Sequence, residues 1–250
     1  MTVVLKLGGS AITEKDRAET VDEEALGELA DAIAGAESDD VVLVHGGGSF
    51  GHHHAEHHGV STTRGSHDVE AVADIHGAMK ALNEAVLATL RERGVPAVPV
   101  HPFSVASRDE SGALAFPTDQ IETLLGEGFV PVTHGDLIAH SGEGVTVVSG
   151  DELVVELAEG LEADRVGLCS TVPGVLDAEG DVIERIDAFE AVADVLGDSD
   201  ATDVTGGMAG KVRTLLDLDA PASVFGPSGV DGFLAGERPG TTIYGTDESS

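Results

Sequence analysis

Lysine is scarce in this sequence. Only four of its 13 basic residues are lysines, at positions 6, 15, 80 and 211, and they stand against 46 acidic residues. The net charge of -33 excludes nucleic acid and anionic membranes as partners, because both require a basic footprint. A chain with so little lysine is expected to keep it where the charge has a function, although Lys80, in the middle of a long helical pattern, reads as an ordinary surface residue.

Other features are equally rare. A single cysteine, Cys169, excludes an internal disulfide and is interpreted as a buried, inert thiol. There is no tryptophan and aromatics make up 3% of the chain, so small aliphatic residues must fill the core. No apolar run approaches the ~20 residues of a membrane span and no signal peptide is visible, so we expect a soluble cytoplasmic protein. The acidic residues are spread over all segments, which suggests a halophilic source with a high-salt cytoplasm.

The apolar segments alternate with helical patterns. A strand at 2–7, a helix at 20–35 opened by a Thr20/Glu23 capping box, and a strand at 41–44 predict an α/β fold with a mainly parallel central sheet. A long helix is expected from Ser66 to Gly94. Further strands are predicted at 96–100, 129–133, 145–148, 164–169, 222–225 and 241–244. We expect one domain over residues 1–250, with an N-terminal lobe of about 1–160 and a C-terminal lobe of about 161–250.

Two of the predicted strands run directly into glycines. Gly8, Gly9 and Ser10 follow the first strand, and Gly46 to Gly51 follow the strand at 41–44. Glycine leaves backbone N–H groups uncovered, so a strand, a glycine loop and a helix N-terminus together can bind an anion such as phosphate. Three lysines lie near such glycines, and ammonium groups stabilise the charge of a phosphoryl group in transfer. We therefore expect one anionic site served by Lys6, Lys15 and Lys211.

Two better-known nucleotide motifs fit less well. Gly46 to Gly51 matches G-x-G-x-x-G with Glu70 about 20 residues on, as in dinucleotide-binding proteins. A nicotinamide-binding unit has no need of the additional glycine turn with its lysine after the first strand, which disfavours a dehydrogenase. The segment GGMAGKV lacks the P-loop spacing and the Ser/Thr after lysine.

The histidines and two aspartates each allow two interpretations. The run His52, His53, His54, His57 and His58 could bind a transition metal, or His52, which is nearest the glycines, could donate a hydrogen bond to a substrate phosphate. We favour the second and predict no protein metal site. Asp151, after Gly150, is either a helix N-cap or a counter-charge for the lysines or a magnesium ion, and Asp136 is equally ambiguous.

The order of these pieces resembles the amino acid kinase superfamily, and more closely its branch that phosphorylates isopentenyl phosphate in the archaeal mevalonate route. The segments that carry the resemblance are KLGGSAITEKD, HGGGSFGH, PVTHGDLI, SGDEL, LCSTVPGVLD, DVTGGMAGK and GTTIYG, which span nearly the whole chain. The resemblance implies an open αβα sandwich, usually a homodimer, in which the N-terminal lobe binds the phosphoryl acceptor and the C-terminal lobe binds ATP with Mg²⁺.

The resemblance also implies roles for individual residues. The catalytic set would be Lys6, Lys15, Lys211, His52 and Asp151. The ATP contacts would be Lys6, Gly8, Gly9, Ser10, Gly47, Thr171, Gly174, Gly206, Gly207 and Lys211. The acceptor contacts would be Gly46, Gly47, Gly51, His52, Gly135 and Asp136. Thr171 stands where many relatives carry Asp.

The expected activity is therefore ATP-dependent phosphorylation of isopentenyl phosphate to its diphosphate. A kinase acting on a phosphonate such as fosfomycin is the nearest alternative, because a phosphonate presents the same oxygens to His52. A long apolar slot beside the helix face from Val69 to Met79 would distinguish the two. A non-catalytic nucleotide- or metal-binding member is the third possibility.

Overall fold

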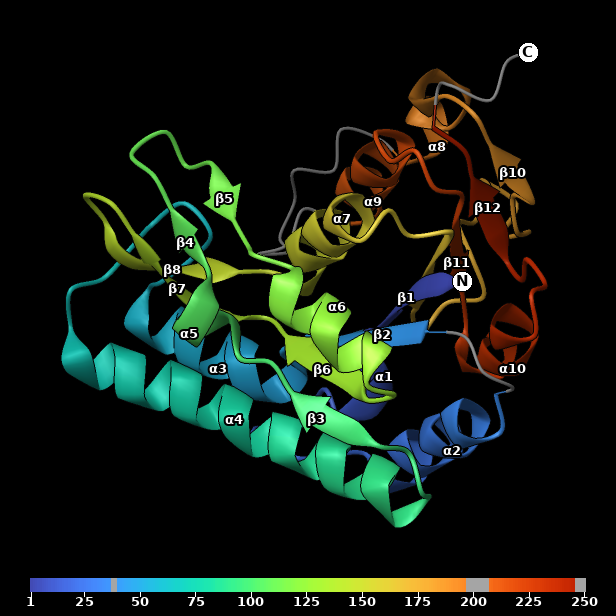
Figure 1. The fold of residues 1–250 in the computed structure, drawn as a ribbon. Coiled ribbons are helices and arrows are strands. Elements are labelled where there is room, and N and C mark those ends of the chain that lie inside the picture. Colours follow the sequence, from blue (N-terminus) through green and yellow to red (C-terminus); the bar gives the residue numbers. More distant parts are fainter. Residues whose placement is uncertain (37–39, 197–206, 246–250) are drawn as a thin grey trace.

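Strand β1 (Thr2–Leu7) lies at the centre of the main sheet (Figure 1). The computed structural model describes residues 1–36, 40–196 and 207–245. β1 pairs in parallel with β2 (Asp40–His45) on one side and with β9 (Arg165–Cys169) on the other. Since parallel strands share the same direction, the loops after β1, β2 and β9 all emerge at one edge of the sheet.

The main sheet is almost entirely parallel. Within the described residues it contains eight strands, and only β11 and β12 pair antiparallel. This confirms the predicted fold class. Its order is β10 (Arg185–Ile186), β12 (Thr241–Ile243), β11 (Ala222–Phe225), β9, β1, β2, β6 (Val130–His134) and β3 (Ala97–Pro99).

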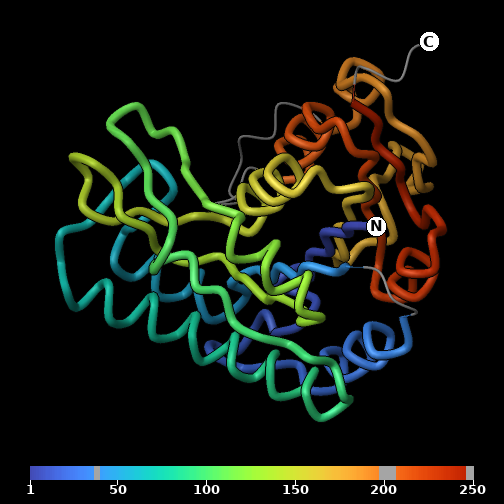
Figure 2. The backbone as a smooth tube through the Cα atoms, in the orientation of Figure 1, coloured from blue at the N-terminus to red at the C-terminus, as the bar shows by residue number. Residues whose placement is uncertain are grey.

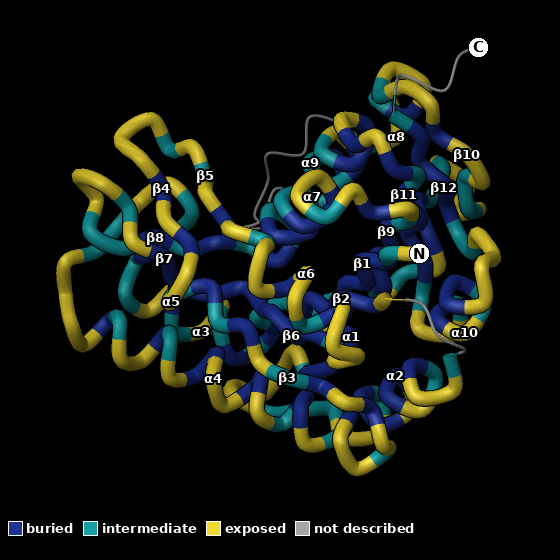
Figure 3. Tube along the Cα trace, in the orientation of Figure 1, coloured by how far each residue is buried: buried dark blue, intermediate teal, exposed yellow. Residues whose placement is uncertain are grey.

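Helices cover both faces of this sheet, which makes the fold an αβα sandwich. One face carries α2 (Glu23–Ala34), α4 (Val69–Glu92) and α10 (Val230–Leu234), and the other carries α6 (Asp119–Gly126), α7 (Gly150–Gly160) and α9 (Gly207–Leu216). Figure 3 shows the central strands buried between these layers. None of the helices in the described ranges is long and apolar enough to cross a membrane.

Side chains alternate between the two faces of the sheet along β1, and this alternation sets the direction of Lys6. Val3, Leu5 and Leu7 pack in the layer of α2 and α4, whereas Val4 packs in the layer of α7. Successive side chains of a strand point to opposite faces, so Lys6 lies on the same face as Val4, below α7.

A smaller sheet projects from one side of the molecule (Figure 2). Its strands are β5 (Leu114–Ala115), β4 (Ser107–Arg108), β7 (Asp136–His140) and β8 (Gly144–Val148). The sequence analysis predicted β8 but not β7, because His134-Gly135-Asp136 reads as the end of β6. The remaining elements are α1 (Gly9–Ile12), α3 (Gly48–His58), α5 (Pro102–Val105), α8 (Ala193–Leu196) and the 3₁₀ turns η1 (Phe189–Ala191) and η2 (Pro227–Gly229).

Two predicted helix starts are wrong. The cap of α2 is Asp22, whose side chain accepts a hydrogen bond from the Ala25 amide at 3.0 Å, and Thr20 instead bonds to Ala18 in the preceding loop. The cap of α4 is Asp68, whereas Ser66 pairs through its backbone with Val145 of β8. In both cases an aspartate nearer the helix competes as a cap, because carboxylates accept N-terminal amide hydrogens well.

Candidate active site

A cavity of about 300 Å³ opens where β1, β2 and β9 end. In open α/β sheets this edge is the usual place for ligands, since the connecting loops diverge there. Most of the residues predicted for the site line this cavity, and they come from distant parts of the chain: Lys6, Gly8, Gly9, Ser10, Lys15, Gly46, Gly47, Gly51, His52, Gly135, Asp136, Asp151, Thr171 and Lys211.

The two glycine turns touch each other backbone to backbone. A Cβ on Gly9 would lie 2.2 Å from the Gly48 nitrogen, and one on Gly46 would lie 2.7 Å from the Gly9 nitrogen. Gly48 also has a φ of +48°, a conformation that L side chains rarely adopt. No larger residue fits at this contact, so the glycines bring the ends of β1 and β2 together.

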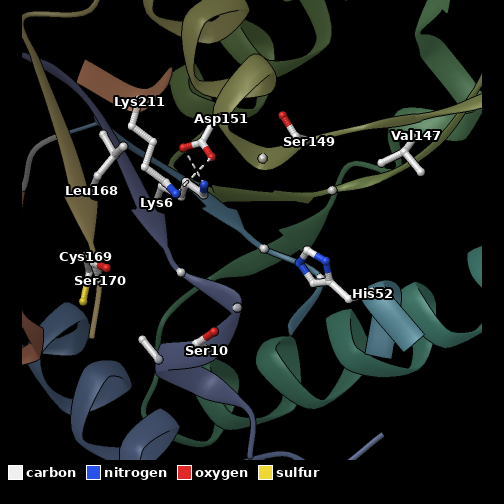
Figure 4. A pocket seen from close by; sticks show the side chains of 18 of the residues that line it. Lys6, Ser10, His52, Val147, Ser149, Asp151, Leu168, Cys169, Ser170 and Lys211 are labelled. Atoms are coloured by element: carbon white, nitrogen blue, oxygen red, sulfur yellow. Dashed lines mark ion pairs between the residues drawn. The ribbon is translucent and has the colours of Figure 1, made fainter. Parts of the chain in front are cut away.

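The strongest charge contact in the cavity is a triad of two lysines and one aspartate. Lys6 Nζ lies 2.6 Å from Asp151 Oδ1, and Lys211 Nζ lies 4.0 Å from Asp151 Oδ2. Figure 4 shows both ammonium groups converging on this carboxylate. The Lys6 side chain is only 9% exposed, so its charge depends on the aspartate as a partner. The Lys6–Asp151–Lys211 triad thus holds two cations close together in the cavity.

Asp151 is available to the lysines because another residue caps its helix. Ser149 is the N-cap of α7 and forms a capping box with Glu152, in which each side chain bonds to the other's backbone N–H. The N-cap interpretation of Asp151 is therefore wrong, and its carboxylate points to the lysines instead. Its place in the first turn also suits a negative charge, because the helix N-terminus is electropositive.

His52 and Lys15 lie on a more exposed wall of the cavity. His52 is on α3, which begins directly after the second glycine turn, and Figure 4 shows its ring well apart from the triad. Lys15 belongs to the loop between α1 and α2 and is exposed. The cavity thus presents the triad on one side and these two residues on another.

Asp136 lines the cavity, and its carboxylate is bonded to a residue of α4. The side chain is fully buried and lies 2.9 Å from His76 Nδ1 of α4, and Asp136 Oδ1 accepts from the Leu137 amide at 2.8 Å. Burial raises the pKa of this carboxyl, although the hydrogen bond to His76 acts in the opposite direction. Asp136 therefore joins β7 to α4 through its side chain.

A few predicted residues do not line the cavity. Gly174 packs against Thr241 and Val182, where a Cβ would lie 2.7 Å from each, and Gly207 is the first residue of α9. Gly206 lies outside the described residues. Glu70, the acidic partner of the dinucleotide interpretation, is exposed at the start of α4 and does not border the cavity.

The cavity is also lined by part of the predicted helix face from Val69 to Met79, and by residues to which the sequence analysis gave no role in the site. Ile75 and Met79 form an apolar wall on α4, whereas Val69, the first residue of the predicted helix face, is 78% exposed. The helical spacing of Ile75 and Met79 was visible in the sequence, but not which turn faces the ligand. The other lining residues are Ala11, Ala55, Val147, Val148, Ser149, Gly150, Leu168, Cys169, Ser170, Met208 and Val224. Burial raises the pKa of the Cys169 thiol to about 12, in keeping with an inert thiol.

The histidine run is divided between separate partners. His54 pairs with Glu19, and His58 pairs with Asp74 of α4. Across residues 1–36, 40–196 and 207–245 no group of three or more His, Cys, Asp or Glu side chains is arranged to hold a metal ion.

A parallel sheet whose strand ends present two touching glycine turns and paired lysines defines a protein that handles phosphoryl groups. Comparison with known proteins places it more narrowly. The family model of the amino acid kinase family matches residues 1–218. The chain belongs to the amino acid kinase family.

Individual relatives agree with this assignment. The chain is 66% identical to an isopentenyl phosphate kinase of Haloferax volcanii over 97% of this chain and 98% of the relative. It is 35% identical to an isopentenyl phosphate kinase of Methanothermobacter thermautotrophicus over 86% and 85% of the two chains. A crystal structure of isopentenyl phosphate kinase superposes with a TM-score of 0.83 at 28% identity, covering 97% of this chain and 100% of the other.

Proposed function

We propose that this protein transfers the γ-phosphoryl group of ATP to isopentenyl phosphate and forms isopentenyl diphosphate, in isoprenoid biosynthesis by the archaeal mevalonate route. The observation that carries the proposal is the Lys6–Asp151–Lys211 triad in one cavity with Lys15 and His52. The similarity to isopentenyl phosphate kinases over almost the full chain supports the same substrate.

The chemistry needs no covalent enzyme intermediate, because the acceptor phosphate is itself a nucleophile at neutral pH. Lys6, Lys15 and Lys211 neutralise the charge that spreads over the moving phosphoryl group, and Asp151 keeps two of them in place. His52 donates a hydrogen bond to the acceptor phosphate. The amides of Gly8 and Gly46 donate to Cys169 and Leu7, so other amides of the two glycine turns contact further phosphate oxygens, with ATP on the side of Ser10 and Thr171.

The acceptor's apolar part fits the same cavity. Ile75 and Met79 of α4 line it near the second glycine turn, and a Cβ on Gly51 would lie 2.7 Å from the Met79 sulfur. An isopentenyl chain gains from such a wall, whereas a compact, polar phosphonate does not. This apolar wall favours the prenyl substrate over fosfomycin.

The proposal also covers the magnesium ion, the oligomeric state and the salt concentration at which the protein works. Within the described residues the carboxylates form no cage for a metal, and Asp151 is occupied with lysines, so we assign no protein ligand to Mg²⁺. Mg²⁺ commonly binds through substrate phosphates and water, and would arrive here with ATP. We further propose a cytoplasmic homodimer, which the resemblance to the family implies. We also propose adaptation to high salt, because a net charge of -33 requires screening.

A direct assay tests this function. The purified protein is incubated in molar KCl with Mg²⁺, ATP and either isopentenyl phosphate or fosfomycin, and products are followed by ³¹P NMR. We expect the two coupled phosphorus signals of a diphosphate monoester with isopentenyl phosphate, together with ADP. If fosfomycin but not isopentenyl phosphate were phosphorylated, the substrate would be a phosphonate instead. ATP binding with no product from either acceptor would support a non-catalytic protein.

A further inference from the structure

The loop from Thr13 to Val21, here named the lysine loop, carries Lys15 to the cavity. An isolated bridge between Thr13 and Val21 closes its base, and the Glu14 amide donates to the Thr20 carbonyl at 3.0 Å. Beyond this base the loop has no regular secondary structure of its own. The position of the Lys15 backbone therefore depends on what the loop is attached to.

The first turn of α3 supplies one attachment through a single residue. The Ser49 amide donates to Thr13 Oγ1 at 3.0 Å, and the Glu19 amide donates to the Ser49 carbonyl at 3.3 Å. The Thr20 amide lies 3.4 Å from Ser49 Oγ. Both ends of the lysine loop are thus bonded to the helix that follows the second glycine turn.

A side-chain contact between a histidine and a glutamate supplies the second attachment. His54 Nε2 lies 2.5 Å from Glu19 Oε1, and the two residues are 35 positions apart in the chain. Glu19 has a φ of +49°, a left-handed conformation that is unfavourable for residues other than glycine. A glutamate here is held in a disfavoured backbone conformation by its contacts to α3.

The same helix carries His52, two residues before His54. Residues at i and i+2 of a helix do not face the same way, so His52 borders the cavity while His54 reaches the lysine loop. The helix α3 is therefore the rigid element shared by the acceptor histidine and the loop that bears Lys15.

We propose that His54 and Glu19 form a latch that positions Lys15 relative to His52. Both are positioning residues: they touch no substrate and act through Lys15. The inference rests on the proposed function, in which Lys15 and His52 contact reacting groups. Catalysis by positioned charge is sensitive to small displacements, so releasing the latch should weaken the contribution of Lys15 while leaving Lys6 and Lys211 in place.

The chain contains a matched control for this latch. His58 of α3 also contacts a carboxylate, that of Asp74, at 2.9 Å. The side chains of His58 and Asp74 are 15% and 52% exposed, against 19% and 50% for His54 and Glu19. This second pair joins α3 to α4 and does not touch the lysine loop. If such surface contacts only stabilised the fold in general, His54→Ala and His58→Ala would have equal effects on the lysine loop.

The first test needs no substrate. Hydrogen exchange of the full-length protein is measured at the amides of residues 14–20. For His54→Ala and Glu19→Ala we expect exchange roughly five-fold faster than in the original protein, the size of a strong exposed pair, and for His58→Ala less than a two-fold change. Glu19→Gln keeps an acceptor oxygen and should recover part of the protection. Unchanged exchange in His54→Ala, or an equal rise in His58→Ala, would overturn the latch.

The second test asks whether the latch acts through Lys15. We expect His54→Ala to lower kcat/KM for isopentenyl phosphate phosphorylation roughly five-fold, and to lower it less than two-fold in a Lys15→Met background. The same loss in both backgrounds would contradict the proposal. If the unchanged protein has no such activity, the proposed function fails, while the exchange experiment still decides whether His54 and Glu19 hold the loop.

Discussion

Lys6 and Lys15 bring positive charge to the same cavity in opposite ways. Lys6 stands on the central strand of the sheet, is 7% exposed, and lies 2.6 Å from Asp151. Lys15 stands on an exposed loop that is attached to the molecule through α3. The first position is fixed by the same packing that stabilises the fold, and the second is fixed by polar contacts at the surface. Substitutions of Lys6 and of Lys15 should therefore differ more in their effect on the free energy of unfolding than in their effect on activity.

Replacing each lysine by methionine gives the largest expected effect. Lys6→Met removes the nearer of the two ammonium groups that the described residues place beside Asp151, so we expect a loss of about 3 kcal/mol in the free energy of unfolding. Its kcat should fall about 1000-fold, because a preorganised cation is lost at the phosphoryl group. Urea denaturation and steady-state kinetics in molar KCl measure both quantities.

Lys15→Met is the matched control for that comparison. We expect kcat/KM to fall about 100-fold while the free energy of unfolding changes by less than about 0.5 kcal/mol, as for most exposed substitutions. Equal destabilisation by the two replacements would remove the distinction between a buried and an exposed lysine.

Acid should destabilise the folded protein through two buried histidines. His45, the last residue of β2, and His134, the last of β6, are buried with stacked rings, and burial lowers the pKa of His45 from 6.5 to about 4 and that of His134 as well. Between those pH values the unfolded chain binds more protons at these histidines than the folded chain, so stability falls as pH falls. For His45 alone the loss is about 3 kcal/mol from pH 6.5 to 4.

The measurement is urea denaturation at fixed KCl between pH 7 and pH 5, comparing the original protein with His45→Gln. The variant should lose less stability on acidification. His57→Gln, on the exposed outer part of α3, is the control and should keep the full slope. Asp136, whose pKa is raised by burial, acts in the opposite direction in both proteins and cancels in the comparison. Identical slopes for the original protein and His45→Gln would contradict this account.

His52 should show the smallest of these effects, and only on the acceptor. Loss of its hydrogen bond to a charged phosphate costs about 2 kcal/mol, so His52→Ala should raise KM for isopentenyl phosphate roughly 30-fold and leave KM for ATP nearly unchanged. His53→Ala, the adjacent exposed residue outside the cavity, should change neither value. A rise in the KM for ATP would show that His52 contacts ATP, and would contradict its assignment to the acceptor.

Much of the fold and site could be predicted from the sequence because strong local signals coincide. Buried apolar strands followed by glycines predicted the parallel sheet, and the scarcity of lysine identified Lys6, Lys15 and Lys211, which line one cavity. Helix starts were less predictable: several residues near each start can cap, and only the path of the preceding chain decides between Asp22 and Thr20 or between Ser149 and Asp151.

Pairings across the chain left no local signal. The contact of Asp136 with His76 joins residues 60 positions apart, and the stacking of His45 on His134 depends on β2 and β6 being neighbours. The contact of His54 with Glu19 likewise could not be predicted, because the histidine run suggested metal binding instead. Such contacts become visible only when the sheet order and the loop path are known.

A crystal structure with a non-hydrolysable ATP analogue and isopentenyl phosphate tests the central claim most directly. We predict that the ammonium groups of Lys6, Lys15 and Lys211 lie within about 3 Å of oxygens around the γ-phosphoryl group, with His52 bonded to the acceptor phosphate. A complex in which Lys15 points to solvent, or in which the γ-phosphoryl group lies away from the Lys6–Asp151–Lys211 triad, would contradict it.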